Sequence, residues 1–298
     1  MTQPATLEVA ASKDHHGENF PVASVLIAPR YRPAILAYYR FARAADDIAD
    51  SPTLTPKEKI ARLDAFEATL LGHTDSAATA LPLRASLAET GITPRHALDL
   101  LTAFRMDAVK TRYADWAELM HYCAYSAAPV GRYVLAVHGE SEATWPASDA
   151  LCAALQVINH LQDCAKDYRE INRVYIPLDT LTAQGIGVEA LAAPEASTAL
   201  RACLDGLIDK TADLVATGWL LPPQVRDIRL RIETAMIAQL ADKLVTLLQK
   251  ADPLSEKVHL AKFDFLLQAI LGLFKGLFTG FASSPRVGAL NSVPAKEK

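Results

Sequence analysis

Three carboxylates and a guanidinium lie close together in the segment YYRFARAADDIAD, which begins at residue 38. In a helix, Tyr39, Arg43, Asp46 and Asp50 share one face, with Asp47 beside them. These carboxylates repel one another, so the face needs a positive partner. Mg²⁺ binds carboxylate oxygens and shares its remaining positions with water and phosphates, and arginine binds phosphate oxygens. A solvated helix end is the alternative interpretation.

A second polar stripe lies in the segment QVINHLQDCAKDY, where Asn159, Asp163 and Asp167 follow Gln156 at helical spacing. Leucine, isoleucine and valine surround these residues, so this helix is predicted to be largely buried. A buried acidic stripe is costly unless its charge is compensated. We therefore expect the two helices to face each other across a cavity and to bind Mg²⁺ and a diphosphate. The predicted metal ligands are Asp46, Asp47, Asp50, Asn159, Asp163 and Asp167.

Three further segments carry polar residues that allow two interpretations. His16 and Asn19 lie either at a polar helix entry or at the lip of the active site. Asp107 lies in FRMDAVKTRYADW, which is either a solvated helix end or a phosphate contact. Arg173 and Tyr175 follow the second acidic helix and either close over a diphosphate or belong to an ordinary loop.

Helical periodicity and helix-end signals divide the chain into about ten helices, and no segment alternates with the period of a strand. Thr55 and Asp115 are predicted N-caps, and Pro129 and Gly131 are expected to break a helix. The expected helices span residues 32–50, 57–71, 77–89, 94–110, 116–139, 148–168, 194–219, 223–250 and 256–280, with Ser148 opening the second acidic helix. We predict an all-α fold with one domain over residues 15–282, between flexible tails at 1–14 and 283–298.

Composition narrows the class of protein. The chain has 298 residues, 51% of them hydrophobic, and a net charge of only −4, which gives a sizeable core and no basic surface for nucleic acid. The four cysteines form no CxxC pair, as is typical of a reduced cytosolic protein.

The two ends of the chain bear on its location. The first 13 residues lack the apolar core of a signal peptide. The apolar run in the last helix is shorter than the ~20 residues of a membrane span. We therefore expect a cytoplasmic protein that is not secreted and has no transmembrane span, whose last helix packs on the core and touches the inner face of the membrane.

Five segments together resemble the squalene and phytoene synthase family over about residues 15 to 280, and within it the bacterial hydroxysqualene-forming branch of hopanoid biosynthesis. They are HHGENFPVAS, YRFARAADDIAD, FRMDAVKTRYADW, YCAYSAAPVGR and INHLQDCAKDYREINRVYIP. The resemblance implies the class I isoprenoid (terpenoid) synthase fold, a helical bundle around a central apolar cavity.

The resemblance also implies residue roles. The two aspartate-rich motifs and a tyrosine that handles protons form the implied catalytic set, which is Asp46, Asp50, Asp163, Asp167 and Tyr125. The implied diphosphate-binding set is His16, Asn19, Tyr39, Arg43, Gln156, Arg173 and Tyr175. The second motif departs from the family pattern D-x-x-E-D, because Lys166 stands at the position of the glutamate and Gln162 at that of the preceding arginine. This departure implies weaker or fewer metal ions.

The implied reaction is the Mg²⁺-dependent ionisation of presqualene diphosphate, followed by rearrangement and capture of water to give hydroxysqualene and diphosphate. A presqualene diphosphate synthase would hand over the substrate. One alternative is the condensation of two prenyl diphosphates, which yields presqualene diphosphate, squalene or phytoene. The non-enzymatic alternative is a helical lipid-binding or assembly protein.

Overall fold

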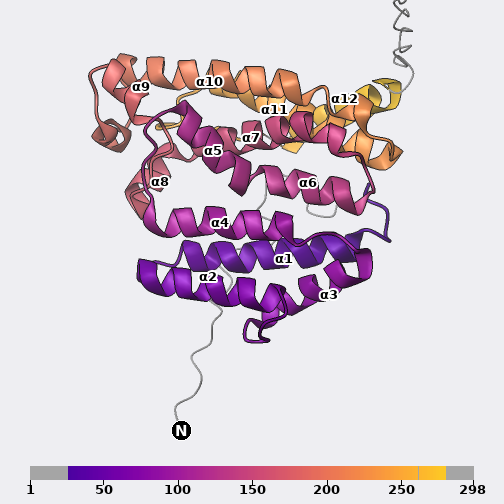
Figure 1. Cartoon of the computed structure of the whole chain (residues 1–298). Helices are drawn as coiled ribbons and strands as arrows, with labels where there is room; N and C mark the ends of the chain where they lie inside the picture. Colours follow the sequence, from indigo (N-terminus) through magenta and orange to yellow (C-terminus); the bar gives the residue numbers. More distant parts are fainter. Residues whose placement is uncertain (1–25, 261, 280–298) are drawn as a thin grey trace, which may run out of the picture.

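A computed structural model describes residues 26–260 and 262–279, which form stacked layers of helices (Figure 1). No strand occurs in these two ranges, so the predicted all-α fold is confirmed. The longer helices are α1 Arg32–Ala49, α2 Pro56–Leu70, α3 Leu81–Thr90, α4 Arg95–Val109, α5 Trp116–Ser126, α6 Ala128–Val137, α7 Trp145–Gln162, α8 Cys164–Ile171, α9 Leu178–Ala183, α10 Thr198–Gly218, α11 Ile228–Leu248 and α12 Lys262–Thr279.

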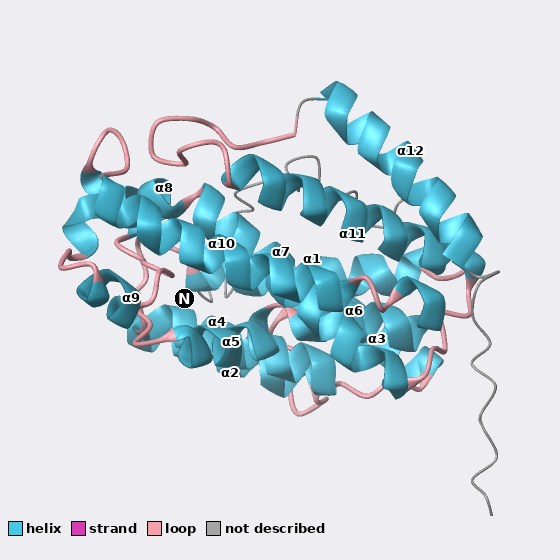
Figure 2. Cartoon of the chain, turned by 90° about the horizontal axis from the view of Figure 1, so that it is seen from above, coloured by secondary structure: helices cyan, strands magenta, loops and turns pink. Residues whose placement is uncertain are grey.

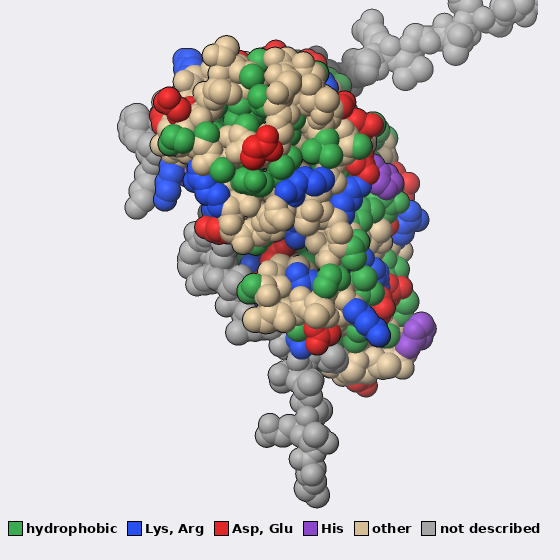
Figure 3. All heavy atoms as spheres, turned by 90° about the vertical axis from the view of Figure 1, so that its left-hand side faces the viewer, with side chains coloured by type: hydrophobic (Ala, Val, Ile, Leu, Met, Phe, Trp, Pro, Cys, Tyr) green, Lys and Arg blue, Asp and Glu red, His purple; other side chains and the backbone are tan. Residues whose placement is uncertain are grey.

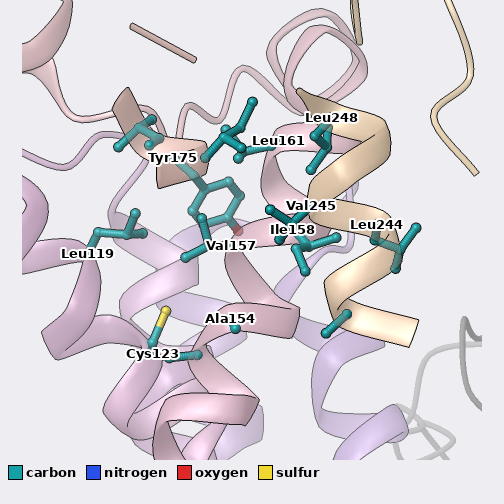
Figure 4. Packing of buried hydrophobic residues seen from close by; sticks show 14 of the residues in the cluster. Leu119, Cys123, Ala154, Val157, Ile158, Leu161, Tyr175, Leu244, Val245 and Leu248 are labelled. Carbon is teal, nitrogen blue, oxygen red and sulfur yellow. The ribbon is translucent and has the colours of Figure 1, made fainter. Parts of the chain in front are cut away.

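The helices surround two hydrophobic clusters. One lies under α1 to α4 and contains Phe41 and Phe66, both fully buried. The other surrounds α7, where Ile158 packs with Val245 of α11 (Figure 4). Seen from above, α7 lies among the other long helices, whereas α12 lies at the edge (Figure 2). The second acidic stripe therefore begins on the central helix, α7. The apolar residues around the stripe in the sequence predicted that this helix is buried.

Both predicted N-caps are confirmed. The Thr55 side chain accepts a hydrogen bond from the backbone N–H of Glu58, whose carboxylate accepts one from the Thr55 N–H, which completes a capping box. Asp115 accepts from the backbone N–H of Glu118 at the start of α5.

The predicted helix break is also confirmed, because α5 ends at Ser126 and α6 begins at Ala128, with Pro129 in its first turn. Gly131 then allows α6 to approach α7 closely. A Cβ atom at Gly131 would lie 2.5 Å from Ser148 Oγ and 2.7 Å from Cys152 Sγ. This close approach positions the small residues of α5 and α6 beside the middle of α7.

The predicted start of the second acidic helix was wrong. This helix begins at Trp145, with a proline in its first turn, and Ser148 is buried against Gly131. It is also divided, because Asp163 lies between α7 and α8 with φ −101° and ψ 8°. The Asp163 N–H still bonds to the Asn159 carbonyl at 3.0 Å, and the Asp167 N–H to the Asp163 carbonyl at 2.8 Å. The stripe therefore keeps its helical spacing across the break.

The last helix packs on α11 through glycines. A Cβ atom at Gly272 would lie 2.5 Å from Met236 Cα, and one at Gly276 would lie 2.8 Å from Ile232 Cα. No helix in the described ranges is both long and apolar enough to cross a bilayer. The side of α12 away from α11 exposes large apolar side chains, which are Ile270, Leu271, Phe274 and Leu277.

Candidate active site

The two polar stripes meet at one cavity of about 370 Å³. The α1 residues that line it include Tyr39, Arg43, Asp46 and Asp50. The α7–α8 residues that line it include Gln156, Asn159, Asp163 and Asp167. The expectation that the two helices share a cavity is therefore met, while the roles of these residues as ligands stay predictions.

On the α1 side, an arginine pairs with two of the carboxylates. Arg43 lies 2.9 Å from Asp46 Oδ2 and 2.7 Å from Asp47 Oδ1. Burial and the nearby Asp50 carboxylate raise the pKa of Asp46 to about 7, against the opposing effect of Arg43. Asp47 is buried and does not line the cavity. Its position one residue off the stripe turns it toward Arg43 and the protein interior, which does not favour its predicted role as a metal ligand.

The carboxylates on the α7–α8 side differ from those on α1. Within the described ranges, neither Asp163 nor Asp167 forms an ion pair with an arginine or with any other cation. Burial and the Asp163 charge raise the pKa of Asp167 to about 7. Two neighbouring carboxylates with this little compensation are a suitable donor set for a cation.

The donor set can be tested against Mg²⁺. Across residues 26–260 and 262–279, no three His, Cys, Asp or Glu side chains lie close enough to surround one ion. Mg²⁺ is usually bound by one or two carboxylates together with substrate phosphates and water. The carboxylates on opposite walls of the cavity fit this shared coordination, in which a diphosphate would complete the shell.

Arg173 connects the α1 stripe to α4. It donates to Asp50 Oδ1 at 3.0 Å and to the backbone carbonyl of Asp107 at 3.1 Å. Asp107 is buried and accepts a 2.8 Å hydrogen bond from the Tyr122 hydroxyl. Burial, opposed by the Arg173 charge, raises the pKa of Asp107 to about 6. Asp107, Tyr122, Arg173 and Tyr175 all line the cavity.

Both interpretations of the FRMDAVKTRYADW segment therefore apply, because one part of it is a solvated surface and another part faces the cavity. Asp107 faces the cavity, whereas Arg105 pairs at the surface with Asp64 and Glu67. Helical geometry explains the difference, since residues two apart point in different directions.

An aromatic wall completes the cavity. The Tyr175 ring stacks on the His160 ring with centroids 3.4 Å apart, and it lies beside Val157 and Leu161 (Figure 4). Burial raises the pKa of Tyr175 and Tyr122, so both phenols remain protonated. Burial and the Arg173 charge lower the pKa of His160 to about 3, so its ring is neutral.

Neither His160 nor Tyr122 was among the site residues predicted from the sequence. The available signal for His160 was its position one turn after Gln156. The available signal for Tyr122 was its spacing of four residues from Ser126, which also lines the cavity.

One predicted site residue lies elsewhere, and two others are not described. Tyr125 does not line the cavity and instead packs edge-on against His121, with ring centroids 5.2 Å apart. The direction of α5 turns Tyr122 inward in its place, so the geometry does not favour the predicted role of Tyr125 in proton handling. His16 and Asn19 lie outside the described residues.

Apart from Ser126, the remaining cavity wall is apolar. Leu100 and Phe104 of α4 and Val130 of α6 line it, together with Ala42 and Ile171. The C-terminal ends of α1, α4 and α7 lie at the left of Figure 1, and Figure 3 faces this end. Lysine and arginine side chains gather near the middle of that face, with acidic side chains between them. The cavity therefore combines charged groups suited to a diphosphate with walls suited to hydrocarbon.

Comparisons with known proteins identify the family of this chain. The family model for squalene/phytoene synthase matches residues 13–264. The hydroxysqualene synthase of Rhodopseudomonas palustris is 55% identical over 260 residues, which cover 87% of this chain and 89% of that protein. The hydroxysqualene synthase of Zymomonas mobilis is 46% identical over 273 residues, which cover 91% and 92%.

Solved structures show the same fold. A squalene synthase from Alicyclobacillus acidocaldarius superimposes with a TM-score of 0.69 at 30% identity, covering 78% of this chain and 88% of that one. A dehydrosqualene synthase superimposes with a TM-score of 0.73 at 21% identity, covering 84% and 88%. The helical bundle is thus the class I isoprenoid synthase fold, and the chain belongs to the squalene/phytoene synthase family of enzymes.

Proposed function

We propose that this enzyme ionises presqualene diphosphate with the help of Mg²⁺ and converts it to hydroxysqualene and diphosphate. The observation that carries the proposal is the single cavity onto which both aspartate-bearing stripes open. The relatives named hydroxysqualene synthase support this choice of reaction.

The charged residues would bind the diphosphate and favour its departure. Asp46 and Asp50 on one wall, and Asn159, Asp163 and Asp167 on the other, would hold Mg²⁺. The bound metal would neutralise the charge that grows on the leaving group. Arg43 and Arg173 now contact carboxylates. When substrate binds, its diphosphate oxygens would compete with these carboxylates and accept hydrogen bonds from the two arginines.

The apolar wall would hold the hydrocarbon part of the substrate. Leu100, Phe104 and Val130 line this part of the cavity and would exclude bulk water while the cation rearranges. The raised pKa values of Tyr122 and Tyr175 keep these phenols neutral, so they cannot add to the cation as phenolates.

Lys166 stands where the family pattern has a glutamate. Its side chain is exposed and does not line the cavity, so it places no positive charge there. The cavity therefore lacks one family carboxylate without gaining a cation. We therefore keep the expectation of weaker or fewer metal ions as a prediction, which a calorimetric titration with Mg²⁺ and pyrophosphate would count.

The decisive experiment compares two substrates with pure enzyme, Mg²⁺ and no NADPH. Presqualene diphosphate should yield hydroxysqualene and one equivalent of diphosphate, whereas farnesyl diphosphate alone should remain unchanged. Turnover of farnesyl diphosphate would instead support the condensing alternative. No turnover and no Mg²⁺-dependent diphosphate binding would support the non-enzymatic alternative.

We further propose that the exposed side of α12 rests on the membrane surface, where a presqualene diphosphate synthase would release the substrate. Phe274 is 53% exposed on this side, next to the exposed Leu271. Phe274→Asp should reduce flotation of the enzyme with anionic vesicles. Turnover of detergent-dispersed substrate should not change, and equal flotation of both proteins would contradict this placement.

A further inference from the structure

One polar pair in the cavity comes from the part of α7 that precedes the aspartates. His160 follows Gln156 by one turn of α7, and its Nε2 atom is 3.2 Å from the carboxamide nitrogen of Gln156. Both side chains line the cavity. Gln156 precedes Asp163 by seven residues, or about 10 Å along a helix axis. Gln156 is thus set back from the aspartates along the helix, whereas His160 lies one turn before Asp163.

The chemistry of the two groups fixes the direction of their hydrogen bond. A carboxamide nitrogen only donates, so His160 Nε2 accepts and a neutral ring carries its proton on Nδ1. Within the described ranges, neither His160 Nδ1 nor Gln156 Oε1 makes another hydrogen bond. Gln156 Oε1 is therefore the acceptor that this pair offers to a small ligand, because Nδ1 lies on the far edge of the His160 ring and points away from Gln156.

The His160 ring is held in place on two sides. Tyr175 stacks on its face at 3.4 Å with an interplanar angle of 12°, and Gln156 holds its Nε2 edge. The helical neighbours Ile158 and Leu161 are core residues. Buried polar atoms are almost always hydrogen-bonded, so the fixed Gln156 carboxamide, which lines the cavity, calls for a ligand that donates to its Oε1 atom. Water is such a ligand.

We propose that Gln156, held in place by His160, binds the water molecule that captures the carbocation, an inference that rests on the proposed function. The C–O bond to diphosphate breaks with its electron pair on the leaving group. After the rearrangement, a lone pair of this water forms the new C–O bond. The resulting oxonium ion gives its extra proton to the departed diphosphate, and no oxidant or reductant is required. Gln156 Oε1 accepts a hydrogen bond from the water and so increases the electron density on its oxygen, while His160 is the positioning residue.

The test measures how ionised molecules divide between products. The His160→Phe variant retains a ring that can stack on Tyr175 but removes both nitrogens. His96→Phe is the matched control, because His96 is also buried and packs edge-on against Trp145, yet does not line the cavity. Each enzyme is incubated with presqualene diphosphate and Mg²⁺ in H₂¹⁸O, and diphosphate release and organic products are quantified.

The wild type and the His96→Phe variant should convert nearly every released diphosphate into ¹⁸O-labelled hydroxysqualene. For His160→Phe we expect the ratio of hydroxysqualene to elimination and rearranged products to fall roughly tenfold, the factor for one lost hydrogen bond. His160→Asn, which keeps a polar side chain, should restore part of the ratio. Should His160→Phe fail to fold, Gln156→Met is expected to show the same change.

The outcomes separate the two proposals. An unchanged product ratio in a folded His160 variant, or in Gln156→Met, would overturn the role of the pair and leave the proposed function standing. Wild-type enzyme that forms no hydroxysqualene from presqualene diphosphate would overturn the proposed function itself.

Discussion

The α1 wall and the α7–α8 wall of the cavity carry similar carboxylates, but the negative charge is neutralised differently on each wall. On α1, Arg43 contacts Asp46, and Arg173 contacts Asp50. On α7–α8, Asp163 and Asp167 form no ion pair in the ranges that the structure describes. Both walls hold a carboxylate whose pKa is raised to about 7 by burial and a neighbouring carboxylate.

This difference shows which wall depends more on a bound cation. An arginine that already contacts a carboxylate can exchange that contact for a diphosphate oxygen, so the α1 wall is partly compensated before substrate binds. The α7–α8 wall has no ion pair among the described residues and is only partly compensated by the charges of Arg173 and Lys166, so it depends more on a metal ion or a proton. We therefore expect substitutions on the two walls to affect activity alike but metal-free stability differently.

The largest expected effect comes from removing one carboxylate on either wall. Asp163→Asn and Asp46→Asn should each lower kcat by roughly 10²–10³-fold or more, because charge on the departing diphosphate is no longer neutralised. Circular dichroism should retain the helical signal. Without Mg²⁺, thermal unfolding should show Asp163→Asn to be at least as stable as wild type, because repulsion with Asp167 is relieved. Asp46→Asn should gain less stability, because it also weakens the Arg43 pair.

The exposed Asp209→Asn on α10 is the control and should behave like wild type. Equal metal-free stabilities of the Asp46 and Asp163 variants would contradict the distinction between the walls.

The second effect concerns the residue that connects the α1 stripe to α4. Arg173→Gln should lower kcat/KM by about 100-fold and also reduce the melting temperature, since it leaves Asp50 and the buried Asp107 without their cation. A double variant with Asp107→Asn should regain stability but not activity. Additive losses of stability in the two single variants would show that the charges are not coupled.

The third effect separates two tyrosines on one helix. Tyr122→Phe should reduce kcat by about tenfold, because it removes the hydroxyl that donates to Asp107 at the cavity wall. Tyr125→Phe should change kcat by less than about twofold, because Tyr125 does not line the cavity. Steady-state kinetics of both variants check this order, and a larger loss for Tyr125→Phe would restore its predicted role.

The smallest effect is a dependence of stability on pH. The unfolded chain ionises aspartate near its ordinary value of 3.8, whereas folded Asp46 and Asp167 resist ionisation up to about pH 7. Without metal, these groups therefore favour folding at low pH, and that stability is lost as the pH rises from about 4 to about 7. Mg²⁺ with pyrophosphate binds the ionised forms and should raise the melting temperature by several degrees more at about pH 8 than at about pH 6. A shift independent of pH would mean that these carboxylates do not bind the metal.

Local sequence patterns were sufficient to predict most of the helices. Helical spacing predicted the polar face of α1, and Thr55 and Asp115 marked two helix starts, because caps and faces depend on residues within one or two turns. The start at Ser148 failed because that position lies inside α7, where a close contact with Gly131 requires a small side chain.

The sequence by itself determined that two carboxylate stripes exist, which residues belong to each, and the family to which the chain belongs. Only the tertiary structure decided that Asp107, Tyr122 and His160 join these stripes, and that Tyr125 and Asp47 do not line the cavity. The physical reason is that the spacing of residues along the chain decides which side chains share one face of a helix. The packing of α4, α5 and α7 decides which other side chains contact that face.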